Sequence, residues 1–158
     1  MCVQDRACLF GLVVDGNVLL NDAGRMVERW WIETGQKYPE TYLDEFVVMP
    51  NHVHGIVFLD PPIGAAQRGR PVPAVEGQAH RPAPTVGDIV RWFKTMTTNE
   101  YTRRVRAEGW AVFDGVLWQR NYYERIVRNE RELYATRQYI LDNPANWDKD
   151  DENPEHGR

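Results

Sequence analysis

Two histidines one residue apart begin an apolar stretch of the sequence, "MPNHVHGIVFL", residues 49–59. Because a β-strand sends alternate side chains to opposite faces, His52 and His54 are expected to share one face of a strand. Two neutral imidazoles so placed can supply two ligands to a divalent metal ion. A histidine that ends a turn, followed by a hydrogen-bonded histidine at a strand start, explains this short motif equally well or better.

A third ligand has to come from elsewhere, and the last predicted helix offers one. Its apolar stripe is expected to comprise Leu133, Ile140 and Leu141, with Tyr134 packed at the edge. At about 100° per residue, Tyr139 points roughly 140° away from the centre of that stripe. Asn143 follows Tyr139 by one helical turn and lies on the same side. Two histidines, an amide oxygen and an unburied tyrosine are the components of a metal-assisted phosphotransfer site.

Length and composition predict one domain, residues 1–158, of a cytoplasmic protein. A chain of 158 residues is long enough to bury a real core. The two cysteines, Cys2 and Cys8, lie too close together to suggest a disulfide framework. No segment resembles a signal peptide or reaches membrane-spanning length, so no membrane partner is expected.

The charge is unevenly distributed along the chain. Residues 1–62 carry 4 Lys and Arg against 9 Asp and Glu, whereas residues 89–139 carry 10 against 6, a net of +4. The middle of the chain is therefore the predicted phosphate-facing part. Its candidate DNA-binding residues are Arg91, Lys94, Arg120, Arg125, Arg128, Trp118 and Tyr122. A solvated helix face with ordinary packing aromatics would give the same composition.

The order of predicted elements is β-α-β-β-α-β-α, which is that of an α+β, ferredoxin-like (split βαβ) antiparallel sheet with helices on one face and an extra C-terminal helix. A Pro/Gly-rich flexible loop is expected at 60–85, and a polar acidic tail at 148–158. Asn21 and Asn129 are expected to cap helices. The expected elements are a hairpin-like segment at 9–20, helices at 22–35, 86–107 and 130–143, and strands at 42–49, 52–59 and 116–128.

Several segments together resemble one family. "VVMPNHVHGIV" is similar to the HUH motif of single-tyrosine DNA transposases, and "LWQRNYYERIVRNERELYATRQYILDNPANW" resembles the C-terminal signature of the REP-associated tyrosine transposases. "CLFG", "LNDAG", "WW" and "LDEFVVMPNH" extend the resemblance over nearly the whole chain outside 60–85. The resemblance implies that Tyr139 is the catalytic nucleophile. It also implies that His52, His54 and Asn143 are the metal ligands.

The implied activity is nicking and rejoining of single-stranded or hairpin DNA, through a 5′-phosphotyrosine intermediate, by a monomer or homodimer. Oxygen-rich substrate ligands favour Mg²⁺ or Mn²⁺ over Zn²⁺ as the cofactor. A non-catalytic nucleic-acid-binding module and a small metallohydrolase are the alternatives, and neither would form a covalent adduct. One difference concerns the N-terminus: family members begin with a full central strand, of which "MCV" can supply only a small part.

Overall fold

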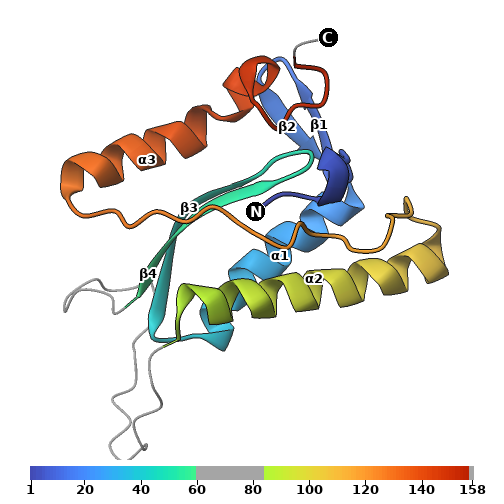
Figure 1. The fold of residues 1–158 in the computed structure, drawn as a ribbon, viewed down its shortest axis with the longest axis horizontal. Coiled ribbons are helices and arrows are strands. Elements are labelled where there is room, and N and C mark those ends of the chain that lie inside the picture. The colour runs from blue at the N-terminus through green and yellow to red at the C-terminus, as the bar shows by residue number, and fades with distance from the viewer. Residues whose placement is uncertain (60–83, 157–158) are drawn as a thin grey trace, which may run out of the picture.

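A computed structural model describes residues 1–59 and 84–156, and it shows a mixed α+β fold (Figure 1). The predicted 60–85 loop falls almost entirely outside the described residues. None of the described helices has the length and apolar character needed to cross a membrane. The elements are the 3₁₀ turn η1 (Gln4–Arg6), β1 (Gly11–Val14), β2 (Asn17–Leu20), α1 (Asp22–Lys37), β3 (Thr41–Val48), β4 (Val53–Leu59), α2 (Val86–Glu108), α3 (Glu130–Asp142) and the 3₁₀ turn η2 (Pro144–Lys149).

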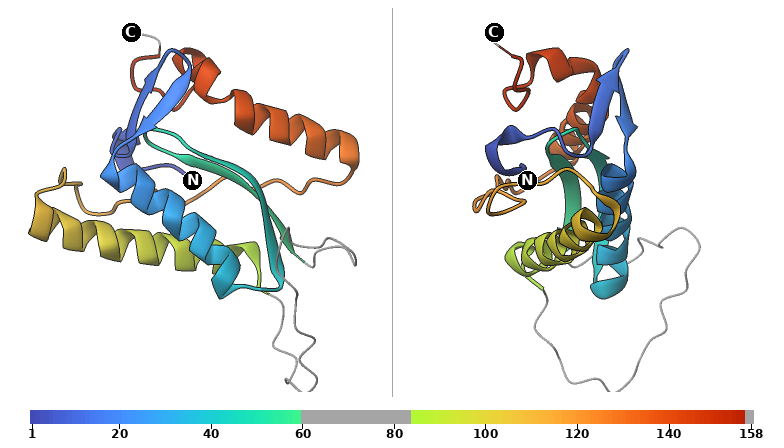
Figure 2. Two further views of the ribbon diagram at one scale, coloured as in Figure 1. Left: turned by 180° about the vertical axis from the view of Figure 1, so that it is seen from behind. Right: turned by 90° about the vertical axis from the view of Figure 1, so that its right-hand side faces the viewer.

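The antiparallel ribbon of β3 and β4 runs through the middle of the molecule (Figures 1 and 2). Its register pairs Val48 with Val53 and Val47 with His54, across the tight turn at Pro50-Asn51. Both strands were predicted from the sequence, and both are confirmed. His52 immediately precedes β4 and His54 is its second residue. The histidine pair therefore lies at the end of β4 next to the turn.

The two faces of this ribbon are covered by different helices (Figure 2). Val53 and Val57 face a large core shared with α1 and α2, which includes Val27, Trp31 and Phe93. The opposite face meets α3 in a smaller apolar cluster, built from Ile56, Phe58, Leu133, Ile140 and their neighbours. The alternation of β4 therefore separates a core face from the face that bears the histidines.

Polar side chains fix where the three long helices begin. Asn21 accepts a hydrogen bond from the backbone N–H of Gly24, and Thr85 forms a reciprocal capping box with Asp88. Asn129 accepts from the N–H of Glu132 in the same way and starts α3. The caps predicted at Asn21 and Asn129 are confirmed. The start of α3 matters most, since it determines which of its residues face the histidines.

The strand predicted at 116–128 is wrong. Only Trp118 of this segment forms a bridge, to Val3, while Cys2 bridges to His52. The backbone N–H of Gln119 donates to the carbonyl of Cys2, so the first residues of the chain lie between the start of β4 and this segment. Aromatic and β-branched residues favour a strand only where the backbone finds a partner. Beyond Gln119 the described chain offers no such partner.

The described residues do not form the predicted ferredoxin-like sheet. They contain two separate two-stranded antiparallel sheets, β1–β2 and β3–β4. A four-stranded sheet would require the segment at 9–20 and the one at 116–128 to pair with β3 and β4. The first instead folds back on itself as a hairpin around Asp15-Gly16, and the second makes only the single bridge from Trp118 to Val3.

Gly55 allows a direct contact between β4 and α1. A Cβ atom at this position would overlap the six-membered ring of Trp31, which is 3% exposed. We expect Gly55→Ala to lower the free energy of unfolding by about 1–3 kcal/mol, because the indole has to move within a packed core. Urea denaturation of the purified variant measures the change.

Gly87→Ala is the matched control for this prediction. A Cβ at Gly87, in the first turn of α2, would lie 3.6 Å from the nearest heavy atom, which is ordinary contact. Its stability should stay unchanged or rise by about 0.4–1 kcal/mol. Equal stabilities of Gly55→Ala and the wild type would show that Trp31 does not rest on the β4 backbone.

Candidate metal and tyrosine site

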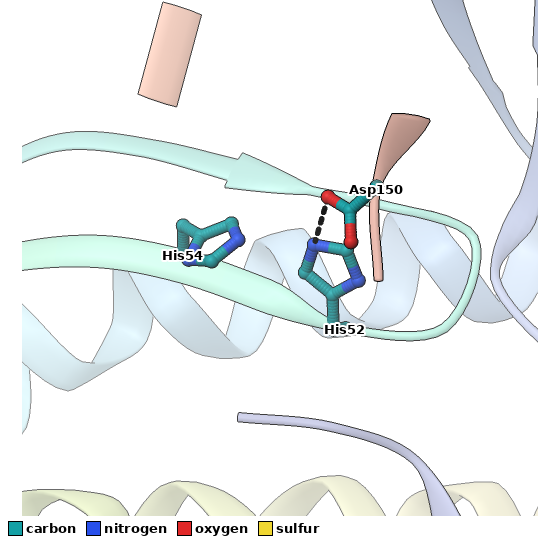
Figure 3. A group of neighbouring side chains, drawn as sticks. All are labelled: His52, His54 and Asp150. Carbon is teal, nitrogen blue, oxygen red and sulfur yellow. Dashed lines mark ion pairs between the residues drawn. The ribbon is translucent and has the colours of Figure 1, made fainter. Parts of the chain in front are cut away.

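His52 and His54 lie side by side on the face of β4 that meets α3 (Figure 3). Their ring centroids are 4.6 Å apart and the rings are nearly perpendicular, at 78°. His52 is 1% exposed, and its ring lies 6.0 Å from that of Trp147 in η2. The strand alternation predicted from the sequence is confirmed at this pair.

Asn51, which the sequence interpretation missed, determines the tautomer of His52. Its Nδ2 donates to the backbone carbonyls of Arg6 and Glu152 at 2.9 and 2.7 Å. The amide oxygen must therefore be the atom that faces His52, where it lies 2.9 Å from Nδ1. Since an amide oxygen only accepts, Nδ1 carries the proton and Nε2 keeps a free lone pair.

Tyr139 and Asn143 come to the same place from α3 and its C-terminal cap. The Tyr139 ring meets the edge of His54, with centroids 5.3 Å apart, and the residue is 57% exposed. Asn143 still has helical φ and ψ, so its side chain lies on the same face of the helix as Tyr139, one turn further on. It is buried, at 3% exposure. The structure thus brings together all four residues predicted to form the site.

Two other predictions for α3 are wrong. Leu141 was placed in the apolar stripe and Tyr134 at its packed edge, but they are 54% and 66% exposed. The apolar contact of α3 is narrower than predicted, because the helix packs on a ribbon of only two strands. Leu133 and Ile140 supply that contact as predicted.

The C-terminal segment, expected only as an acidic tail, adds a carboxylate to the site. Asp150 Oδ2 lies 4.0 Å from Nε2 of His52 and accepts a hydrogen bond from Nδ2 of Asn143 at 3.3 Å. One donor atom each from His52, His54 and Asp150 lie within 4.8 Å of one another (Figure 3). No sequence signal placed Asp150 here, since a contact across about a hundred residues leaves no local pattern.

Two buried acceptors at this point have no hydrogen-bond donor among the described residues. They are Nε2 of His52 and Oδ1 of Asn143. An unsatisfied buried polar atom costs about 1–3 kcal/mol, so native structures rarely keep two of them together. A cation would satisfy both, and an imidazole nitrogen with amide and carboxylate oxygens is a donor set that divalent metals accept. The residues present therefore fit the divalent ion that the sequence predicts.

Both histidines are neutral at physiological pH, as metal ligands must be. Burial lowers the pKa of His52 to about 4, and the nearby Asp150 carboxylate opposes part of that shift. Burial and the neighbouring His52 lower the pKa of His54 to about 3. Burial also raises the pKa of the Tyr139 phenol, with Asp150 adding to the shift.

Four of the predicted DNA-binding residues are exposed arginines. Arg91 pairs with Asp88 within α2, and Arg125 pairs with Glu132 of α3. Arg120 and Arg128 are exposed on the extended segment between α2 and α3. All four side chains are accessible to solvent, which a phosphate contact requires, and their role in binding DNA stays a prediction.

The other three predicted DNA-binding residues make contacts within the fold. Trp118 is 5% exposed, packs against Phe10 and Phe93, and donates its Nε1–H to Thr97, so it cannot stack on a base. Lys94 donates to the carbonyl of Gln119 at 2.7 Å. Its ammonium also lies 5.4 Å from the half-buried Tyr122 ring, so Lys94 and Tyr122 hold the extended segment against α2.

The fold and the site define an α+β protein with two histidines, an amide and a tyrosine gathered on one face of a β-ribbon. No established protein-family profile matches the chain. No solved structure matches it. A Haemophilus influenzae protein, named "Uncharacterized protein", is 35% identical over 151 residues, which cover 95% of this chain and 80% of that protein. The chain therefore belongs to the same family as this Haemophilus influenzae protein.

The lowered pKa values of the two histidines predict a pH-dependent stability. The unfolded chain takes up protons as the pH falls through the ordinary value of 6.5, whereas the folded chain does so only near the lowered values of about 4 and 3. Stability should therefore fall as the pH falls from about 6.5 to about 4, by at most about 1.4 kcal/mol per pH unit for each histidine. Urea denaturation in EDTA at several pH values measures this slope.

The double variant His52→Gln, His54→Gln separates the contribution of the histidines to the pH dependence of stability from that of the carboxylates. Its stability should depend less on pH than that of the wild type between about 6.5 and 4. Identical slopes for the two proteins would show that the histidines take up protons equally well when folded.

Proposed function

We propose that this protein nicks and rejoins single-stranded DNA, with Tyr139 as the nucleophile and a divalent cation, Mg²⁺ or Mn²⁺, held by His52, His54 and Asn143. The observation that carries the proposal is the pair of buried, unsatisfied acceptors, His52 Nε2 and Asn143 Oδ1, beside an exposed tyrosine. The resemblance of the sequence to REP-associated tyrosine transposases supports the same assignment.

Tyr139 is the side chain assigned the attack on phosphorus, because the histidine nitrogens would be bound to the cation. Its oxygen would displace the 3′-oxygen of one nucleotide, giving a 5′-phosphotyrosyl bond and a free 3′-hydroxyl. When bound, the cation would polarise the phosphate and offset the negative charge that develops on its oxygens. The bond between Tyr139 and the DNA would itself be a phosphodiester. A 3′-hydroxyl could therefore attack it, release the tyrosine and rejoin the strand without another energy source.

The accessible position of Tyr139 suits a large substrate. The phenol is 57% exposed while His52 and Asn143 behind it are buried, so a DNA strand could approach from the solvent side without opening the core. The phenol needs help to ionise, because burial and Asp150 raise its pKa above the ordinary value of 10. A nearby cation would shift that pKa in the opposite direction.

The proposed substrate is hairpin DNA of the kind that REP-associated transposases process, bound by a monomer or a homodimer. The exposed arginines of the extended segment, Arg120, Arg125 and Arg128, would contact phosphates in a sequence-independent way. A non-catalytic module derived from such an enzyme is the second candidate. It is favoured by one observation: the acidic segment around Asp150 lies against the site, where a phosphate would be repelled.

The nucleophile can be tested by replacing Tyr139 with phenylalanine. Incubation with labelled hairpin DNA and Mn²⁺, followed by a denaturing gel, should show a covalent protein–DNA adduct for the wild type and none for Tyr139→Phe. DNA binding should remain nearly unchanged, since only one hydroxyl group is lost.

Tyr134→Phe is the matched control, because Tyr134 is exposed on the same helix but does not contact the histidines. The Tyr134→Phe variant should form the covalent protein–DNA adduct as the wild type does. An adduct that survives in Tyr139→Phe would assign the nucleophile to another residue, with Tyr123 the next candidate. Binding without any adduct in the wild type would favour the non-catalytic module.

A further inference from the structure

We propose that Asp150 is a ligand of the divalent cation, so that the C-terminal segment completes the metal site begun by His52 and His54. This inference rests on the proposed function, because it adds a ligand to the same metal centre. The carboxylate comes from a segment that follows the predicted tyrosine helix, and the geometry around it carries the argument.

The position of Asp150 matches that of the other donors. Its Oδ2 faces Nε2 of His52 at 4.0 Å, and the donor atoms of the two histidines and Asp150 lie within 4.8 Å of one another (Figure 3). Three donors spread evenly around one cation, at about 2.0–2.2 Å from it, lie at most about 3.8 Å apart. The group would therefore have to contract by about 1 Å to bind one ion with all three donors.

The segment that carries Asp150 is fixed by contacts on both sides. Glu152 accepts a hydrogen bond from Asn51 through its carbonyl, and its own N–H donates to Asp150 Oδ1 at 2.7 Å. Trp147 packs near His52, and Arg6 forms an ion pair with Glu152 at 3.3 Å. The Asp150 carboxylate is thus directed at the histidines by the fold itself.

Asp150 also lacks a countercharge in the described part of the chain. Its side chain is 11% exposed, and among the described residues its only ion-pair partner is His52. A largely buried carboxylate without a cation is unfavourable unless something supplies the charge. Neither the Asn143 amide nor a neutral imidazole does so, whereas a divalent cation at the centre of the cluster would.

The resulting donor set has a charge suited to a phosphodiester. Two neutral imidazoles, one amide oxygen and one carboxylate contribute −1, so a bound divalent cation leaves the site with a net charge of +1. That charge is opposite and equal to the −1 of one phosphodiester group. Imidazoles combined with a carboxylate bind Mn²⁺ and softer divalent ions better than oxygen ligands alone, so we expect Mn²⁺ to bind more tightly than Mg²⁺.

Titration calorimetry with MnCl₂ tests the role of Asp150. We expect Asp150→Asn to bind Mn²⁺ at least tenfold more weakly than the wild type, because the only charged ligand is removed. Asp151→Asn is the matched control: it removes the same charge from the neighbouring, exposed residue and should bind as the wild type does. Asp150→Glu keeps the charge and should recover part of the affinity.

A second measurement uses the wild-type chain and does not depend on the variant folding. Mn²⁺ should slow amide hydrogen exchange in residues 147–153, because a coordinated Asp150 ties this segment to β4. Unchanged exchange, or equal Mn²⁺ affinity of Asp150→Asn and the wild type, would overturn this inference and leave the His52, His54 and Asn143 centre standing. Failure of the wild type to bind Mn²⁺ would instead overturn the proposed metal centre itself.

Discussion

The hydrogen bond between Asn51 and His52 is the constraint on which the site depends. Asn51 is fully buried, and its Nδ2 donates hydrogen bonds to two backbone carbonyls, one of Arg6 and one of Glu152. Only its oxygen is left for His52, so the imidazole must present an unprotonated Nε2 to the cluster. One amide thereby joins the N-terminal segment, the start of β4 and the C-terminal segment, and it sets the chemistry of the first ligand.

The rest of the fold serves to hold this arrangement on one face of β3–β4. Trp31 and Phe93 pack against the other face, so β4 is anchored by its core side and its polar side is free for a site. On the polar side α3 makes only a short apolar contact, through Leu133 and Ile140. Asn143, the C-cap residue of α3, follows this contact and lies at the site. Two unsatisfied acceptors then remain buried, which a protein tolerates where a ligand supplies the missing interaction.

Local patterns predicted the parts of the site that depend on local geometry. Strand alternation put His52 and His54 on one face, and the Asn129 cap fixed the helix that carries Tyr139. Asn51 and Asp150 were missed because their partners are distant in the sequence, as in the contact between Asn51 and Glu152. The segment at 116–128 was mistaken for a strand because Leu117 and Trp118 are buried in the core. Their apolar character reflects that burial and not strand pairing.

The central claim is that the buried acceptors of His52 and Asn143 are satisfied by a divalent cation. A crystal structure of the protein grown with MnCl₂, with diffraction data collected at the manganese absorption edge, tests it most directly. We expect one strong anomalous peak bonded to His52 Nε2, with His54 and Asn143 also in its coordination sphere. A well-ordered site with no anomalous peak, or with His52 Nε2 donating a proton to Asp150, would contradict the account.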